Sequence, residues 1–157
     1  MGSDAIDESE LSRVSELFHA IQAGIVIHRC GGEIVYANAV AAEILGFSQA
    51  DIESRTSEDP VWQMVLEDGT PVAGEDHPSM VTLRTGEPIR DAVRGLFAGD
   101  GHKTRWLLIN TRPLFEPGDS QPAEVMGTFV DITDQKRAEE AVRLQERELA
   151  LTLDATT

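Results

Sequence analysis

Apolar residues near the N-terminus recur at intervals of three and four, whereas further along the chain they gather in short runs. The first pattern covers residues 11–23 and predicts an amphipathic helix with Leu11, Val14, Phe18 and Ile21 along one face. This face suits either packing on the helix's own domain or the contact surface of a dimer. We expect a homodimer in which these four side chains contribute most of the apolar contact. Residues 1–10 are expected to be a disordered N-terminus or the remnant of a tag.

Short runs of β-branched residues follow within residues 25–36, on either side of Gly31-Gly32. Glycines adopt the positive φ angles that tight hairpin turns need, so this segment predicts a β-hairpin. Asn38 then stands where a helix N-cap belongs, before AVAAEIL, and Gly46 ends that helix. The hairpin is therefore expected to lead directly into a capped helix.

Two more helices are predicted in the middle of the chain. Ser48 is the N-cap candidate of the first, which is short. The second begins at Asp76-His77-Pro78, an N-cap candidate followed by a proline near the first helical position, and Gly86 ends it. The segment between them, residues 58–74, has a turn signal at Asp68-Gly69 but little periodicity.

The second half of the chain predicts three strands and a long helix. IRDAVRGLF and TRWLLINTRPLF flank a turn at Gly99-Asp100-Gly101, and EVMGTFVDI follows as the last strand. Residues 134–157 are charged and contain no glycine or proline, which predicts one helix directly after that strand. Strands at both ends with helices between them indicate an α+β domain with an antiparallel sheet. Helices on one face of such a sheet can enclose an apolar cavity.

Charge and composition exclude several classes of function. A net charge of −15 opposes binding to nucleic acid or to an anionic membrane surface, both of which require basic residues. The single cysteine, Cys30, excludes an intrachain disulfide and a CxxC metal site. With no signal peptide and no apolar run long enough to span a bilayer, we expect a cytoplasmic location and no direct membrane contact.

Several of these motifs together resemble the PAS sensor domain family. They are GEIVYANAVAAEILGFS after the first hairpin, EDGTPVAGEDHPSMVTLRTGEP in the middle, RWLLINTRPLF in the second hairpin and GTFVDIT at the end. The resemblance implies a five-stranded antiparallel sheet of order 2-1-5-4-3, with the PAS domain at residues 24–133. It also implies that residues 134–157 are an output helix leading to a next domain.

The resemblance further implies a role in signal transduction. Such domains dimerise and control an effector on the same chain, for example a histidine kinase of a two-component system or a cyclic-dinucleotide enzyme. The Asp131-Ile132-Thr133 motif matches the family's junction between the last strand and the output helix, so these residues are expected to relay the signal. The C-terminal ELALTLDATT also matches ELFHAIQAG near the N-terminus, either by chance between amphipathic helices or because a second such domain begins there.

A cavity inside the sheet is expected to be lined by residues of the hairpins and helices. Successive side chains of a strand point to opposite faces, so only part of this set can point inward. A small organic ligand, held mainly by apolar contacts, would suit such a cavity. The candidates are Tyr36, Ile44, Leu45, Met80, Leu83, Trp106, Leu108, Asn110, Met126 and Thr128.

Cofactor and catalytic motifs are weak or missing. The Asn-Cys-Arg-Phe-type motif of flavin-binding relatives is absent, and Cys30 lies at the hairpin turn. His77 suits either a capping or surface role or, as the one candidate, a haem ligand, while His19, His28 and His102 share no metal-like spacing with it. No hydrolase elbow, Walker loop or zincin motif occurs, so no enzymatic activity is expected. Two interpretations remain, a ligand sensor and an empty dimerisation and relay module; a haem- or other cofactor-based redox or gas sensor is the alternative.

Overall fold

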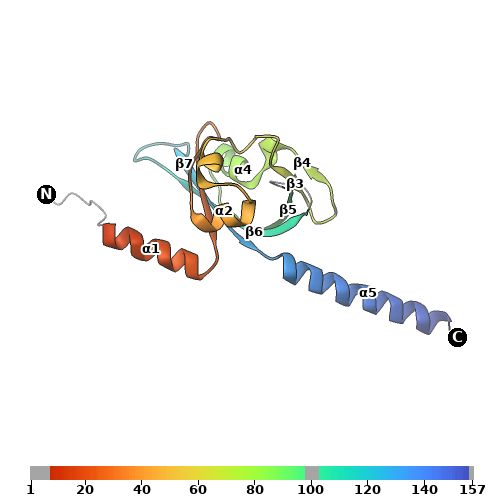
Figure 1. Cartoon of the computed structure of the whole chain (residues 1–157). Helices are drawn as coiled ribbons and strands as arrows, with labels where there is room; N and C mark the ends of the chain where they lie inside the picture. Colours follow the sequence, from red (N-terminus) through yellow and green to blue (C-terminus); the bar gives the residue numbers. More distant parts are fainter. Residues whose placement is uncertain (1–7, 98–102, 156–157) are drawn as a thin grey trace.

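The computed structural model describes residues 8–97 and 103–155, which form a curled sheet with helices against it and one helix extending from each end (Figure 1). The predicted turn at residues 99–101 and His102 lie outside the described residues, as do residues 1–7. The elements in chain order are α1 (Glu8–Ala20), β1 (Gly24–Arg29), β2 (Ile34–Ala37), α2 (Ala39–Leu45), α3 (Gln49–Glu53), β3 (Gln63–Val65), β4 (Pro71–Val72), the 3₁₀ turn η1 (Gly74–Asp76), α4 (Pro78–Thr85), β5 (Ile89–Phe97), β6 (Arg105–Leu114), β7 (Glu124–Asp131) and α5 (Thr133–Ala155).

The sheet has the order β2-β1-β7-β6-β5-β3-β4, and its described pairs are antiparallel. The α+β class is confirmed, but the number of strands is seven instead of the expected five. The two additional strands, β3 and β4, form a short hairpin that pairs with β5 and extends that edge. The other strands, β2-β1-β7-β6-β5, keep the expected sequence of neighbours.

Local turn and cap chemistry agrees with the sequence patterns. Gly32 has a φ of 86° at the turn of the first hairpin, where a side chain would be strained. Asn38 caps α2 by accepting a hydrogen bond from the Ala41 N–H at 2.9 Å, and Ser48 caps α3 in the same way. Gly46 and Gly86 end α2 and α4 in the left-handed conformation.

Some helix boundaries differ from prediction. Helix α1 begins at Glu8 instead of Leu11 and ends at Ala20, because Gln22 has a positive φ of 57° that ends the helix before β1. Asp76 lies in the turn η1 and does not cap α4. The N-cap position belongs to His77, whose side chain makes no capping hydrogen bond.

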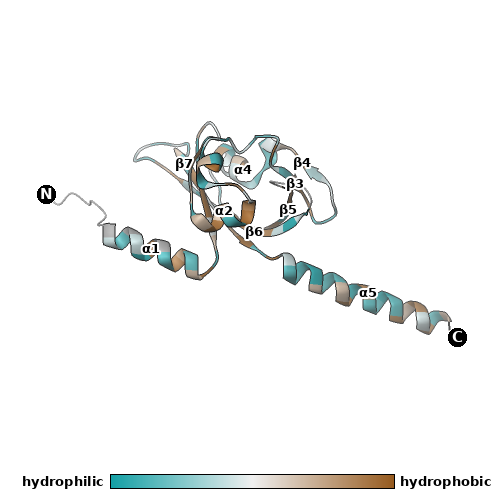
Figure 2. Ribbon diagram, viewed as in Figure 1, coloured by the Kyte–Doolittle hydropathy of each residue, from teal (hydrophilic) through white to brown (hydrophobic). Residues whose placement is uncertain are grey.

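The apolar core fills the space between one face of the sheet, here called the inner face, and helices α2 and α3. Figure 2 shows apolar residues (brown) in the strands and in α2, whereas α5 is mostly hydrophilic (teal). Val40 and Ile52 are among the fully buried side chains of this core, and Val125 of β7 is fully buried as well. Helix α4 covers another part of the same face. A buried hydrogen bond of 2.6 Å joins Thr82 of α4 to Thr111 of β6.

Gly127 of β7 allows a close approach between α4 and the sheet. A Cβ atom at this position would lie 3.2 Å from the Ser79 hydroxyl of α4. The absence of a side chain and the Thr82–Thr111 hydrogen bond together fix the start of α4 against the inner face. This start carries His77, which is the residue that matters most for the site below.

Candidate functional site

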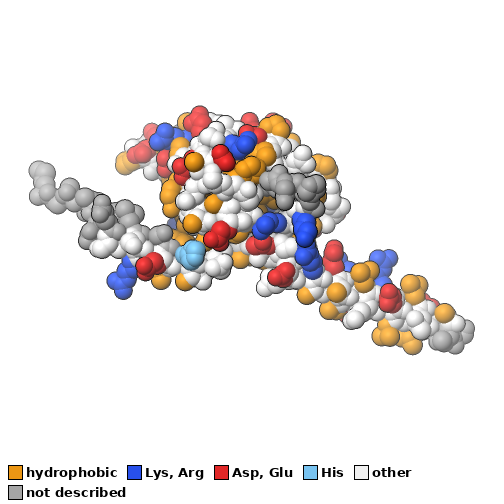
Figure 3. Space-filling view, in the orientation of Figure 1, with side chains coloured by type: hydrophobic (Ala, Val, Ile, Leu, Met, Phe, Trp, Pro, Cys, Tyr) orange, Lys and Arg blue, Asp and Glu red, His pale blue; other side chains and the backbone are white. Residues whose placement is uncertain are grey.

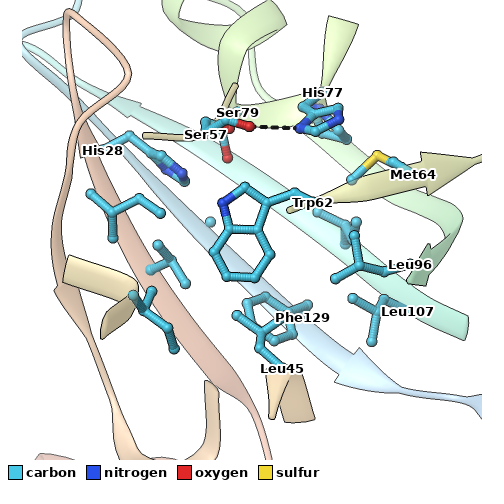
Figure 4. Close-up of a pocket in the computed structure, with 16 residues that line it drawn as sticks. His28, Leu45, Ser57, Trp62, Met64, His77, Ser79, Leu96, Leu107 and Phe129 are labelled. Carbon is cyan, nitrogen blue, oxygen red and sulfur yellow. Dashed lines mark hydrogen bonds between the residues drawn. The ribbon is translucent and has the colours of Figure 1, made fainter. Parts of the chain in front are cut away.

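A cavity of about 90 Å³ lies between the inner face of the sheet and the segments that cover it. Strands β1, β6 and β7 form its floor, and the segment at residues 54–62 and the start of α4 close it (Figure 4). Its lining is Val26, His28, Ile34, Leu45, Ile52, Ser57, Trp62, Met64, His77, Pro78, Ser79, Leu96, Leu107, Ile109, Gly127 and Phe129.

One end of the cavity is polar. His28 of β1, His77 and Ser79 at the start of α4, and Ser57 of the covering segment lie there, while Leu45, Leu107 and Phe129 lie beyond Trp62 (Figure 4). His77 is 4% exposed, and its Nδ1 lies 2.9 Å from the Ser57 carbonyl oxygen. The Nε2 atom of the same ring is buried without a hydrogen-bond partner among the described residues.

His28 is the second buried histidine of this end. Its Nδ1 also has no hydrogen-bond partner in the described part of the chain, and the residue is 6% exposed. Burial, followed by the proximity of His77, lowers the pKa of His28 from 6.5 to about 4. Burial lowers the pKa of His77 as well, although the Ser57 carbonyl, Glu58 and Asp76 oppose this effect. Both rings are therefore uncharged near neutral pH.

The apolar end is built around Trp62. Its indole N–H donates to the Thr56 carbonyl oxygen at 3.1 Å, so the ring needs no polar partner in the cavity. Phe47 packs edge-on against it, with ring centroids 5.3 Å apart, and the Arg55 guanidinium lies over Phe47. These contacts hold the indole as a fixed wall of the cavity.

Most of the predicted cavity residues do not line it. Leu45 does, whereas Ile44 and Leu83 are buried elsewhere and Met80 lies near Gly32. The prediction was wrong in the strands because inward and outward positions were exchanged: Leu107, Ile109, Gly127 and Phe129 point inward. The six strand candidates that lie on the outer face are Tyr36, Trp106, Leu108, Asn110, Met126 and Thr128.

The residues missed by sequence reasoning are mainly His28, Ser57 and Trp62. His28 is a polar residue directly after the apolar run GIVI, and this position was the available signal. Trp62 lies in the segment of weak periodicity, residues 58–74, and Ser57 directly precedes it, so no pattern indicates which of these side chains point inward. His77 was singled out, but for a capping or surface role or as a haem ligand.

The cavity does not fit a haem or a flavin. About 90 Å³ is far too little for a porphyrin or an isoalloxazine ring. Cys30 is exposed at the hairpin turn, away from the cavity lining, so it is not placed to react with a flavin in the cavity. Within the described residues, no group of three or more side chains is placed to hold a metal ion.

A second candidate site is the junction between β7 and α5, where the sequence motif Asp131-Ile132-Thr133 lies. The Asp131 carboxylate accepts from the Thr133 N–H at 2.9 Å and from the Thr133 hydroxyl. The Thr133 hydroxyl in turn accepts from the Trp106 N–H of β6 at 3.0 Å. Asp131 therefore supplies the carboxylate at the start of α5, and Thr133 connects the helix to the sheet.

Further contacts of the junction come from side chains that the motif did not indicate. Arg105 of β6 pairs with Asp131 at 3.5 Å. Lys136, one turn into α5, lies over the Trp106 ring and pairs at 2.5 Å with Glu67 of the β3–β4 turn. The first turn of α5 is thus connected both to the central strands and to the edge hairpin.

Beyond its first turn, the described side chains of α5 are exposed, and so is one face of α1. None of the described residues of α5 is buried, and its Val142, Leu144, Leu149 and Leu151 are exposed. Figure 3 shows hydrophobic side chains (orange) along the surface of this helix. In α1, Val14, Leu17 and Ile21 are exposed and Phe18 is partly buried; the side chain of Leu11 lies outside the described set. No described helix is both long and apolar enough to cross a membrane.

Comparisons with known proteins agree on one family. A family model described as PAS fold matches residues 18–137. The chain is 31% identical over 144 residues to the sensor protein TdiS of Thauera aromatica, which covers 87% of this chain and 24% of the relative. This chain therefore spans about a quarter of the length of that curated relative.

Solved structures share the fold at low sequence identity. A sensory box histidine kinase/response regulator from Burkholderia thailandensis superposes with a TM-score of 0.61 and 18% identity, over 88% of this chain and 98% of that chain. A PAS domain of a protein from Colwellia psychrerythraea gives a TM-score of 0.58 and 16% identity, over 79% and 98%. From the family match and the relative together, the chain belongs to the PAS fold family.

Proposed function

We propose that this PAS domain is a non-catalytic sensory and dimerisation domain of a larger signalling protein. In this proposal residues 24–133 detect a small molecule in the inner cavity, and α5 relays the state of the sheet to an effector on the same chain. A histidine kinase is favoured over a cyclic-dinucleotide enzyme, because the relatives include a sensor protein and a sensory box histidine kinase. The cavity with its two buried histidines favours ligand detection over an empty relay module.

The observation that carries the relay is the direct connection of the sheet to α5. Strand β7 ends at Asp131 and α5 begins at Thr133, so only Ile132 separates them. The Ile132 N–H donates to the Trp106 carbonyl oxygen at 2.8 Å, and Thr133 accepts from the Trp106 N–H. Trp106 and the cavity residue Leu107 are neighbours in β6, so a shift of that strand reaches the helix without a flexible loop.

Replacing Thr133 by Val in the full-length protein is expected to disconnect the effector from the domain. The variant keeps the shape of the side chain but removes the hydroxyl that joins Trp106 to Asp131. A lost cap interaction of about 1 kcal/mol should raise hydrogen exchange in the first turn of α5 about fivefold. Effector output and amide exchange by mass spectrometry are the two measurements.

Two control variants sharpen this test. Thr133→Ser keeps the hydroxyl and should retain regulation, and Thr152→Val removes a hydroxyl that bonds only within the far end of α5. Normally regulated output in an Asp131→Ala/Thr133→Ala protein would contradict the relay.

The proposed homodimer rests on two apolar surfaces. One is the face of α1 with Val14, Leu17 and Ile21. The other is the outer face of the sheet, where Ile27 neighbours Tyr36 and Met126, and Leu108 neighbours Val130. Tyr36 is 41% and Val130 38% exposed. Apolar patches on adjacent elements are typical of surfaces that a second copy covers.

A Val14→Glu/Phe18→Glu variant is expected to convert the dimer to a monomer in sedimentation velocity. Two carboxylates in a desolvated apolar contact lack partners, which costs several kcal/mol and thus lowers the association constant by about a hundredfold or more. Ser12→Glu/His19→Glu adds the same charge on the opposite side of α1 and should leave the dimer intact. A wild-type chain that remains monomeric at high concentration would refute the proposal.

A further inference from the structure

The tautomer of His77 determines what its free nitrogen can bind. A carbonyl oxygen only accepts hydrogen bonds, so the 2.9 Å contact with Ser57 requires the proton on Nδ1. In an uncharged imidazole with a proton on Nδ1, the Nε2 atom carries a lone pair and accepts. His77 lines the cavity, and its Nε2 atom is buried without a protein partner among the described residues. A donor group on a bound molecule would satisfy this acceptor.

His28 adds a second polar position at the same cavity. Its ring is nine-tenths or more buried, and its Nδ1 has no protein partner within the described chain. In either tautomer, an uncharged imidazole offers one donor and one acceptor nitrogen. A hydroxyl both donates and accepts, so it suits a cavity end lined by both rings better than a group that only accepts.

Charge restricts the ligand further. None of the described residues that line the cavity is Lys, Arg, Asp or Glu. Both histidines are uncharged near neutral pH, so the cavity offers no counterion to a carboxylate or an ammonium group. Burying an unpaired charge costs more than these contacts could offset. The ligand is therefore uncharged.

Size and the apolar end define the rest of the molecule. One water-sized volume is roughly 10–15 Å³, so about 90 Å³ admits on the order of six to nine non-hydrogen atoms. Beyond the histidines, the wall consists of Trp62, Phe129 and aliphatic side chains. Aromatic walls favour a ring, since ring pairs gain from edge-on and offset packing.

We infer that the inner cavity binds a small uncharged molecule of the phenol type, with an O–H group donating to Nε2 of His77 and a ring packed against Trp62 and Phe129. This inference rests on the proposed sensory function, because it specifies the ligand class of that same cavity. The O–H group satisfies the buried histidine, and the ring fills the apolar end.

The test compares phenol, benzene and benzoate as probes of the chain near neutral pH, with binding followed by NMR titration. Phenol is expected to bind about tenfold more tightly than benzene, because it satisfies a buried acceptor that benzene leaves unpaired. Benzoate is expected to bind more weakly than either. In the wild-type chain, the ¹⁵N chemical shift of His77 Nε2 should move away from the value of an acceptor nitrogen without a hydrogen bond when phenol binds.

Variants separate this contact from general apolar binding. His77→Leu should weaken phenol about tenfold and leave benzene nearly unchanged, whereas His19→Leu on the exposed part of α1 should change neither. The ¹⁵N signal of the wild-type chain decides the question even if His77→Leu does not fold. Equal binding of phenol and benzene, a preference for benzoate, an unmoved His77 signal or no binding by any probe would overturn the inference.

The same titration distinguishes the ligand class from the relay. If phenol binds and shifts the His77 signal but leaves the amide signals of α5 unchanged, the result supports the ligand class and counts against the proposed relay. If effector output is regulated and depends on Thr133 but the cavity shows no preference for phenol, the ligand class is overturned and the relay stands.

Discussion

Acidification from pH 6.5 to 4 is expected to lower the free energy of unfolding through His28 by on the order of 3 kcal/mol. His28 is buried and uncharged in the folded chain, where its pKa is lowered from 6.5 to about 4. Between these values the unfolded chain binds the proton and the folded chain does not. Stability due to the neutral ring is therefore fully present above pH 6.5 and is lost as the pH falls toward 4.

This dependence can be assigned to His28 by comparing urea unfolding of matched variants at several pH values. His28→Gln removes the titrating ring and should flatten the curve over this range, whereas His19→Gln on α1 should keep the wild-type slope. His77 contributes in the same direction, since burial also lowers its pKa, so some slope remains in His28→Gln. Parallel curves for wild type and His28→Gln would show that His28 is not buried as described.

Asn38→Ala is expected to destabilise the domain by about 3 kcal/mol, well beyond the loss of an ordinary helix cap. Its buried amide accepts from the Ala41 N–H at the start of α2 and from the Ile25 N–H of β1. It also donates to the Ala23 carbonyl oxygen at 3.0 Å. Alanine would leave these backbone groups unpaired in a buried place, each at a cost of about 1–3 kcal/mol before relaxation.

Ser48→Ala is the matched control, since Ser48 caps α3 through one exposed hydrogen bond. This substitution should lower the free energy of unfolding by about 1 kcal/mol or less. Asn38→Asp should fall between the two, because it can accept both N–H groups but cannot donate to Ala23. Urea unfolding near neutral pH provides the comparison. If Asn38→Ala and Ser48→Ala lower the free energy of unfolding by the same amount, the hydrogen bonds of Asn38 between α2 and the start of β1 do not stabilise the domain.

Local chemistry was predictable from the sequence because each signal resides in a few adjacent residues. Gly32, Asn38, Gly46 and Gly86 each mark a conformation or a hydrogen bond formed within one turn of chain, and the structure confirms them. The β3–β4 hairpin was missed because strands of three and two residues are too short to show periodicity. Its position is determined by pairing with β5, which is far away in sequence.

The cavity could not be predicted in detail because both faces of the sheet are apolar. In β6 the inward Leu107 and Ile109 alternate with Trp106 and Leu108 on the outer face, so hydrophobicity does not tell the two faces apart. The same holds in β7, where Gly127 and Phe129 point inward and Met126 and Val130 do not. The assignment depends on which face the helices cover.

In the proposed relay, helix α5 is a lever arm. It has 23 residues, which at about 1.5 Å per residue gives a length of roughly 34 Å. Its first turn contacts Trp106 and Glu67, and from there the helix extends away from the domain (Figure 1). A tilt of about 5° at the attached end would displace the far end by about 3 Å. If the relay operates as proposed, a rearrangement too small to disturb the packed core is amplified to the scale of a side-chain contact at the far end.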